Sequence, residues 1–162
     1  MGKFIHTNIS QIEPKHHSHE QYEYTRHDVT DKHEKYQVIS PNEGNQTVVA
    51  FYTLPPGKSS YPFHYHTTNE EVYYIIAGNG EVETFEGKHP VAAGDVIIFP
   101  VGKHGAHKIT NTGNEPLVYL DVDTNNTPDI AYYPHSNKVG IRSVGCHDNY
   151  RTDNTLAYYD GE

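Results

Sequence analysis

Between Gln46 and Val122, hydrophobic and polar positions alternate in short runs. Alternation with a period of two predicts strands whose side chains face a core and solvent in turn. Many short strands with turn signals at nearly regular spacing, and no helical periodicity, indicate an all-β sandwich or barrel. The expected strands are, in chain order, residues 47–54, 61–66, 71–77, 81–85, 96–99, 107–112 and 117–122.

Turn residues separate these strands. Pro55-Pro56-Gly57 ends the first strand, and Gly78-Asn79-Gly80 predicts a tight hairpin into the fourth. Ala93-Gly94-Asp95 leads into the strand that Pro100 ends. Between these turns, each predicted strand has a length that is usual for strands in globular proteins.

The pattern of hydrophobic and polar positions is less clear on both sides of this region. Residues 1–40 are polar and rich in His, Glu, Lys and Tyr, with one candidate edge strand at 34–39 and a turn at 41–45. The chain from residue 124 looks irregular, apart from one candidate strand at 139–144. We therefore expect a single domain in which residues 41–123 form the barrel and residues 124–162 pack over it as a tail.

Composition limits the core and the partners. The 162 residues suffice for one domain, but only 35% are hydrophobic, and 14 Tyr with no Trp predict a small core of Val, Ile, Tyr and Phe. The formal net charge of -9 argues against nucleic acid and anionic membrane surfaces, which require a basic patch. We expect neither nucleic acid nor membrane as a partner.

The compartment is predicted from cysteine usage and the first residues. Cys146 is the only cysteine, so no intrachain disulfide can form, which fits a reducing compartment. The first ten residues lack the apolar core of a signal peptide, and no apolar run approaches membrane-spanning length. The expectation is a cytoplasmic protein.

Candidate metal ligands gather around one predicted strand. His64 and His66 project from the same face of that strand, roughly 7 Å apart along the backbone. Two imidazoles at this spacing bind one metal ion when other strands contribute further ligands. Glu71 can supply a carboxylate from the next strand, and His107 is placed in the sequence to be the fourth ligand.

Residues 57–111 resemble the double motif of the cupin family. The family's first motif is G-x5-H-x-H-x3,4-E-x6-G, and its counterparts here are Gly57, His64, His66, Glu71 and Gly78. The gap between Gly57 and His64 is one residue longer than in the family. The spacing from Glu71 to Gly78 matches, which selects Glu71 rather than Glu70 as the ligand.

The second cupin motif is G-x5-P-x-G-x2-H-x3-N, which Gly94, Pro100 and Gly102 match. Gly105 stands where the motif has its histidine. His107 is displaced by two residues but keeps the family's spacing to Asn111. We therefore expect residues 103–106 to form a loop with a two-residue insertion.

The resemblance implies a double-stranded β-helix, the jelly-roll barrel of cupins. Three imidazoles and one carboxylate suit Mn, Fe, Ni, Cu or Zn. We expect one divalent transition metal, iron or manganese in the cell, with zinc or nickel as ions acquired during purification. Four protein ligands on an octahedral ion leave two positions for a small-molecule substrate, or for substrate and dioxygen.

Each of the other polar candidates has a functional interpretation and a purely structural one. Tyr73 shares the parity of Glu71 and could donate to a substrate oxygen, or it could be a satisfied core tyrosine. His104 could be a general base at the barrel mouth, or an exposed loop residue. Asn111 is expected to fix the adjacent turn through bonds to the backbone. The tract 15–20, KHHSHE, is expected to be a solvated segment, although it could bind metal.

The tail adds a weaker resemblance. Residues 129–139 and 158–162 are similar to the tail of a group of small bacterial single-domain cupins, which usually have Asp where this chain has His135. The similarity to that group does not indicate a substrate.

Three metal-dependent chemistries fit the predicted site: dioxygenation, decarboxylation, and isomerisation of a sugar or keto acid. The fold does not choose among them. A non-catalytic protein that binds or senses a small molecule is the alternative. We also expect a homodimer, because an N-terminal strand could add to a neighbouring sheet edge and because many cupins dimerise in this way.

Overall fold

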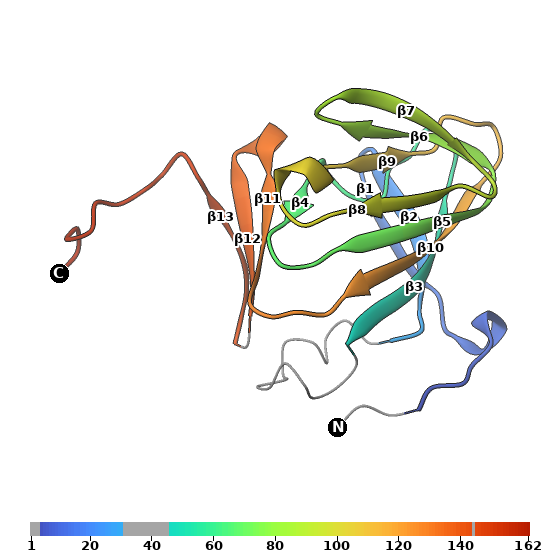
Figure 1. The fold of residues 1–162 in the computed structure, drawn as a ribbon, viewed down its shortest axis with the longest axis horizontal. Helices are drawn as coiled ribbons and strands as arrows, with labels where there is room; N and C mark the ends of the chain where they lie inside the picture. Colours follow the sequence, from blue (N-terminus) through green and yellow to red (C-terminus); the bar gives the residue numbers. More distant parts are fainter. Residues whose placement is uncertain (1–3, 31–45, 144) are drawn as a thin grey trace.

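The computed structural model describes residues 4–30, 46–143 and 145–162, and their regular secondary structure is almost entirely β-strand (Figure 1). The strands form three sheets, with orders β1-β2-β3-β10-β5-β8, β7-β6-β9 and β13-β12-β11-β4. The predicted all-β, double-stranded β-helix is confirmed. Among the described residues, no helix is long and apolar enough to cross a membrane.

The six-stranded sheet consists of β1 (Lys15–His19), β2 (Tyr22–Asp28), β3 (Thr47–Leu54), β10 (Leu117–Thr124), β5 (Glu71–Ala77) and β8 (Val96–Phe99). The three-stranded sheet consists of β7 (Gly87–Ala92), β6 (Asn79–Thr84) and β9 (Lys108–Thr110). The four-stranded sheet consists of β13 (Cys146–Arg151), β12 (Lys138–Ser143), β11 (Asp129–Tyr133) and β4 (Tyr65–His66). In the described part of the chain, the short 3-10 helix η1 (Ile9–Gln11) precedes β1, and η3 (Lys103–Gly105) and η4 (Pro134–Ser136) lie between strands.

The strands predicted at 47–54, 71–77, 96–99 and 117–122 are present as β3, β5, β8 and β10. The strand predicted at 61–66 is reduced to β4, because Pro62 has no N–H to donate to a ladder. Before β4, the chain is held to the β9 segment by an isolated bridge, in which the N–H of His64 donates to the carbonyl of His107 and the reverse.

The hairpin predicted at Gly78-Asn79-Gly80 is wrong. β5 pairs with β10 and β8, whereas β6 pairs with β7 and β9, so this turn carries the chain from one sheet to the other. Gly78 has φ of 80°, and a Cβ there would lie 2.4 Å from the carbonyl oxygen of Pro116. The glycine is therefore required for a sheet-to-sheet corner rather than for a hairpin.

Several polar strands were not predicted. β1 is exposed along its whole length, and β13 is nearly so, so neither shows the alternation that identifies a half-buried strand. In the tail, the strand predicted at 139–144 is present as β12, whereas β11 and β13 were not predicted, and β11 pairs with β4. The strand and turn predicted at 34–39 and 41–45 lie outside the described residues.

The core occupies one part of the barrel interior, and the inner face becomes polar along β10. Leu117 and Tyr119 are fully buried, and the Tyr119 ring stacks on Tyr52 with centroids 5.0 Å apart. The next two inward positions on the same strand are Asp121 and Asp123, which are also buried. The interior therefore changes from an apolar core to an acidic cluster within a single strand.

Candidate metal centre

Three buried or half-buried imidazoles are fixed in one tautomer by their Nδ1 partners. The acceptors are the carbonyl of Pro62 for His64 at 2.9 Å, Oδ2 of Asp129 for His66 at 2.5 Å, and the carbonyl of Gly105 for His107 at 2.8 Å. Carbonyl and ionised carboxylate oxygens accept and do not donate, so each Nδ1 carries the proton. Each Nε2 therefore keeps a lone pair for another partner.

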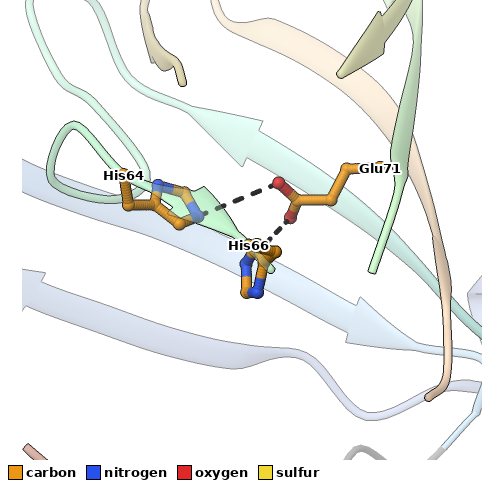
Figure 2. A group of neighbouring side chains, drawn as sticks. All are labelled: His64, His66 and Glu71. Atoms are coloured by element: carbon orange, nitrogen blue, oxygen red, sulfur yellow. Dashed lines mark ion pairs between the residues drawn. The ribbon is translucent and has the colours of Figure 1, made fainter. Parts of the chain in front are cut away.

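The three Nε2 atoms converge on one carboxylate. They lie 3.9 Å, 3.9 Å and 3.2 Å from the nearest oxygen of Glu71, for His64, His66 and His107 respectively. Figure 2 shows the first two imidazoles directed at the two carboxylate oxygens. Lone pairs and a carboxylate oxygen are all acceptors, so a cation between them removes their mutual repulsion.

This donor set fits a divalent transition metal. The ligand atoms of His64, His66 and Glu71 all lie within 4.8 Å of one another, as one ion requires. Imidazole nitrogen and carboxylate oxygen are the ligands that Mn, Fe, Ni and Zn share. The set comes from β4 and β5 together with the bridge before β4, so strand pairing positions it.

His107 lies next to this set but is not within 4.8 Å of all its members. Its ring is fully buried and stacks on Phe99 with centroids 3.6 Å apart. Burial lowers the pKa of His107 to about 4, so the imidazole is neutral, the form that binds metal. Its assignment as the fourth ligand remains a prediction, supported by the 3.2 Å separation from Glu71.

Asp129 supports His66 from the C-terminal sheet, a role that the sequence did not indicate. Its carboxylate is 1% exposed and also accepts from the backbone N–H and hydroxyl groups of Thr67 and Thr68. Burial would raise the pKa of Asp129, but the hydrogen bonds from His66 and Thr68 hold it well below its usual range. A carboxylate that accepts from a metal-binding imidazole fixes the ring and increases its basicity.

The candidate site opens into a cavity of about 400 Å³. Its walls come from the barrel, from β1 and β2, and from the C-terminal sheet, and most of the lining residues are charged side chains, histidines or tyrosines. The lining residues that carry the argument below are His64, His66, Glu71, Asp123, Asp129 and Arg142.

Asp123 is the buried carboxylate next to the predicted ligands. It pairs with Glu71 across β10 and β5, and it lines the cavity at 5% exposure. A carboxylate oxygen from each of Glu71, Asp121 and Asp123 lies within 4.8 Å of the other two. The inward alternation of β10 could have indicated this cluster, since a polar residue at an inward strand position is unusual.

The sequence offered Tyr73 and His104 as candidate catalytic residues, and the structure places them in different surroundings. Tyr73 is 1% exposed, and its hydroxyl lies 3.3 Å from Nε2 of His107. His104 is exposed and lines a different cavity, together with Thr84, Phe85, Glu86, His89 and Lys103. The position of His104 therefore gives no support to a role as general base at the metal.

The steric surroundings of Gly105 explain why the second motif has no histidine at that position. η3 occupies residues 103–105, where the sequence predicted an insertion. A Cβ at Gly105 would lie 1.8 Å from the carbonyl oxygen of Pro100, so no larger residue fits without a backbone shift. The prediction for Asn111 is confirmed, because its side chain bonds to Leu54, Gly113 and Glu115 backbone groups.

A family model described as a cupin domain matches residues 50–123. The oxalate-binding protein of Thermotoga maritima is 42% identical over 69 residues, which are 43% of this chain and 54% of that protein. A glucose-6-phosphate isomerase of Thermococcus onnurineus is 31% identical over 102 residues, which are 56% of this chain and 53% of that protein. The chain thus spans about half the length of these two relatives.

One solved structure covers nearly the whole chain. It is a sugar phosphate isomerase of the cupin superfamily from Silicibacter pomeroyi, with a TM-score of 0.73 and 21% identity. The match covers 94% of this chain and 96% of that chain. Its extent shows that the terminal hairpins belong to the shared fold, and at this identity the likeness concerns the fold alone.

Proposed function

The chain belongs to the cupin superfamily, and on this premise we propose that it is a metal-dependent isomerase of a small, sugar-like metabolite. The observation that carries the proposal is the convergence of the imidazole lone pairs of His64 and His66 on Glu71, in the wall of a polar cavity. The expected ion remains iron or manganese. When bound, it would polarise a carbonyl or hydroxyl oxygen of the metabolite.

Isomerisation between neighbouring carbons needs a group that takes a proton from one carbon and returns it to the next. Asp123 is suited to this step by its position, because it is buried, lines the cavity and lies beside Glu71. The step needs no oxidant, since the proton and the electron pair stay within the metabolite. The glucose-6-phosphate isomerase relative supports the same reaction class.

The cavity lining favours a hydroxyl-rich ligand. Carboxylates, basic side chains and tyrosine hydroxyls line it, and these groups hydrogen-bond to hydroxyls. An aromatic substrate of a dioxygenase would instead require a largely apolar pocket. Because charged residues line this cavity, dioxygenation of an aromatic substrate is less well matched to it than isomerisation.

A second candidate function is non-catalytic binding of a small oxygenated molecule. The likeness to an oxalate-binding protein favours it, since that relative has the higher identity over the matched segment. Tight binding without turnover would distinguish this candidate.

The experiment that tests the proposal is proton exchange in deuterated water, followed by proton NMR. The metal-loaded protein is mixed with aldose and ketose sugars and their phosphates. The proposal expects product formation together with exchange at the carbon next to the carbonyl. Binding without exchange would support the second candidate, and oxygen consumption or carbon dioxide release instead would contradict isomerisation.

We also propose a homodimer that uses the outer face of β5 and β8. Tyr74 and Val96 are cross-strand neighbours there, at 44% and 63% exposure, and Ile98 is 59% exposed. A second copy is the partner that this face fits, because adjacent exposed apolar side chains on an edge strand and its neighbour favour association. Light scattering should give twice the chain mass for the wild type and the chain mass for Ile98→Lys; one chain mass for the wild type would contradict the dimer.

A further inference from the structure

The cavity face of the C-terminal sheet carries a row of small residues next to a predicted metal ligand. His66 on β4 pairs with Ala131 on β11, which pairs with Gly140 on β12. Directly paired residues point to the same face of a sheet. The row leads away from His66, and its small side chains leave space above the sheet for a neighbouring side chain.

Arg142 occupies the space over Gly140. A Cβ at Gly140 would lie only 2.7 Å from Nη2 and 2.8 Å from Nη1 of Arg142, so the guanidinium lies against the glycine. Gly140 is two strands from His66, which corresponds to roughly 10 Å at the usual strand spacing. The guanidinium of Arg142 therefore lies in the same row of paired residues as His66, at a distance that one small metabolite can span.

Neutral acceptors hold this guanidinium in place. Nη1 donates to the carbonyls of Ile141 and Asp148, both at 3.1 Å, and Nη2 donates to Oδ1 of Asn149 at 3.0 Å. A guanidinium has five N–H donors, so the Nε–H and one Nη2–H are left over. No carboxylate of the described residues forms an ion pair with Arg142, although Arg142 lines the cavity.

His147 lies beside Arg142 at the cavity wall. The two are cross-strand neighbours in β12 and β13, and both line the cavity. Arg142 is in turn the cross-strand neighbour of Asp129, the carboxylate that holds His66. Strand pairing thus joins Asp129, which supports the predicted metal ligand, to a positively charged group in the cavity wall.

We propose that Arg142, with His147, binds an oxyanion group of the metabolite whose other end meets the metal. The inference rests on the proposed function, because it places the two ends of one ligand in one cavity. Three covalent bonds of an extended chain span about 3.8 Å, so oxalate is too short to reach both ends. A sugar that carries a terminal phosphate or carboxylate spans the distance, and a guanidinium is the side chain best suited to either group.

The subsite lies outside residues 50–123, the segment that the cupin family model matches. The matched segment supplies the predicted metal ligands, and the C-terminal sheet supplies Arg142, which binds the oxyanion group in this proposal. Ligand choice can therefore change in this sheet while the metal ligands stay the same.

Calorimetric titration of the full-length, metal-loaded protein tests the subsite. The probes are inorganic phosphate, acetate, glucose 6-phosphate and glucose. Arg142→Gln should weaken binding of phosphate and glucose 6-phosphate by roughly tenfold to a hundredfold, the range for hydrogen bonds to a charged group. Arg142→Lys should recover part of this loss, and glucose binding and metal content should not change.

Arg151→Gln is the matched control, because Arg151 lies on β13, pairs with the exposed Asp153 and does not line the cavity. His147→Gln is a second test that leaves the hydrogen bonds of Arg142 in place, and it should weaken phosphate binding severalfold. Circular dichroism checks that each variant is folded.

Equal affinities for both phosphate and acetate in Arg142→Gln and Arg151→Gln would overturn the subsite and leave the metal-dependent isomerase standing. A dependence on Arg142 for acetate but not for phosphate would support a carboxylate as the oxyanion. Phosphate binding that depends on Arg142, in a metal-loaded protein that exchanges no proton with any of the sugars or sugar phosphates, would support the subsite while contradicting the proposed function.

Discussion

The Nδ1 atom of His66 lies 2.5 Å from Oδ2 of Asp129, so a predicted metal ligand is held by a strand that the family model does not cover. β11 brings this carboxylate to the site by pairing with β4 at Ala131 and His66. The C-terminal sheet therefore contributes to the candidate metal centre, and its role is more than covering the barrel.

Asp129→Asn should lower metal affinity by roughly tenfold to a hundredfold, the usual effect of removing such a supporting carboxylate. The amide still fills the space but no longer carries the negative charge that stabilises the His66 ring. Competition with a chromophoric chelator measures the affinity. Asp153→Asn, at an exposed ion pair, is the control, and equal affinities in the two variants would show that Asp129 does not act on the metal.

Tyr73→Phe should retain metal and lower turnover by roughly tenfold to a hundredfold. Burial raises the pKa of Tyr73 well above its ordinary value, so the hydroxyl stays protonated and donates to Nε2 of His107 in this structure. Once that lone pair binds a metal, the hydroxyl is available to a ligand oxygen. Metal content and steady-state kinetics are measured together, and unchanged turnover would assign Tyr73 to the core alone.

Asp123→Asn should abolish proton exchange without loss of metal, whereas His104→Ala should have no effect on either. Asp123 lines the cavity beside Glu71, and His104 is exposed in another cavity. Proton exchange in deuterated water gives the comparison. Loss of exchange in His104→Ala, with Asp123→Asn active, would reverse the assignment.

Gly105→Ala should destabilise the fold by about 1–3 kcal/mol, the usual cost of overpacking, and should also weaken metal binding. The added methyl would collide with Pro100, and any shift would move the carbonyl that accepts from Nδ1 of His107. Thermal melting and metal titration measure the two effects. An unchanged melting temperature together with unchanged metal affinity would contradict this steric account.

The sequence predicted the barrel because β3, β5 and β10 each have one buried face, which alternation identifies. The candidate metal ligands were proposed from strand parity and from the cupin spacing, and the structure brings His64, His66 and Glu71 together. Asn111 was assigned correctly because its bonds to the neighbouring turn are local.

The rest depended on contacts between residues far apart in the chain. β1 and β13 are exposed strands with no apolar face to detect, and Asp129 reaches His66 across 63 positions. His104 is close to His107 in sequence, but η3 directs it to the outside of the barrel. Sequence proximity to a ligand was therefore a poor guide to the cavity lining.

The most direct test of the central claim is metal content by mass spectrometry, on protein purified without added metal or a histidine tag. The wild type is compared with the double variant His66→Ala, His107→Ala. The account predicts near-stoichiometric divalent transition metal in the wild type, iron or manganese, and its loss in the double variant. No metal in the wild type, or equal metal in both proteins, would contradict the four-ligand site.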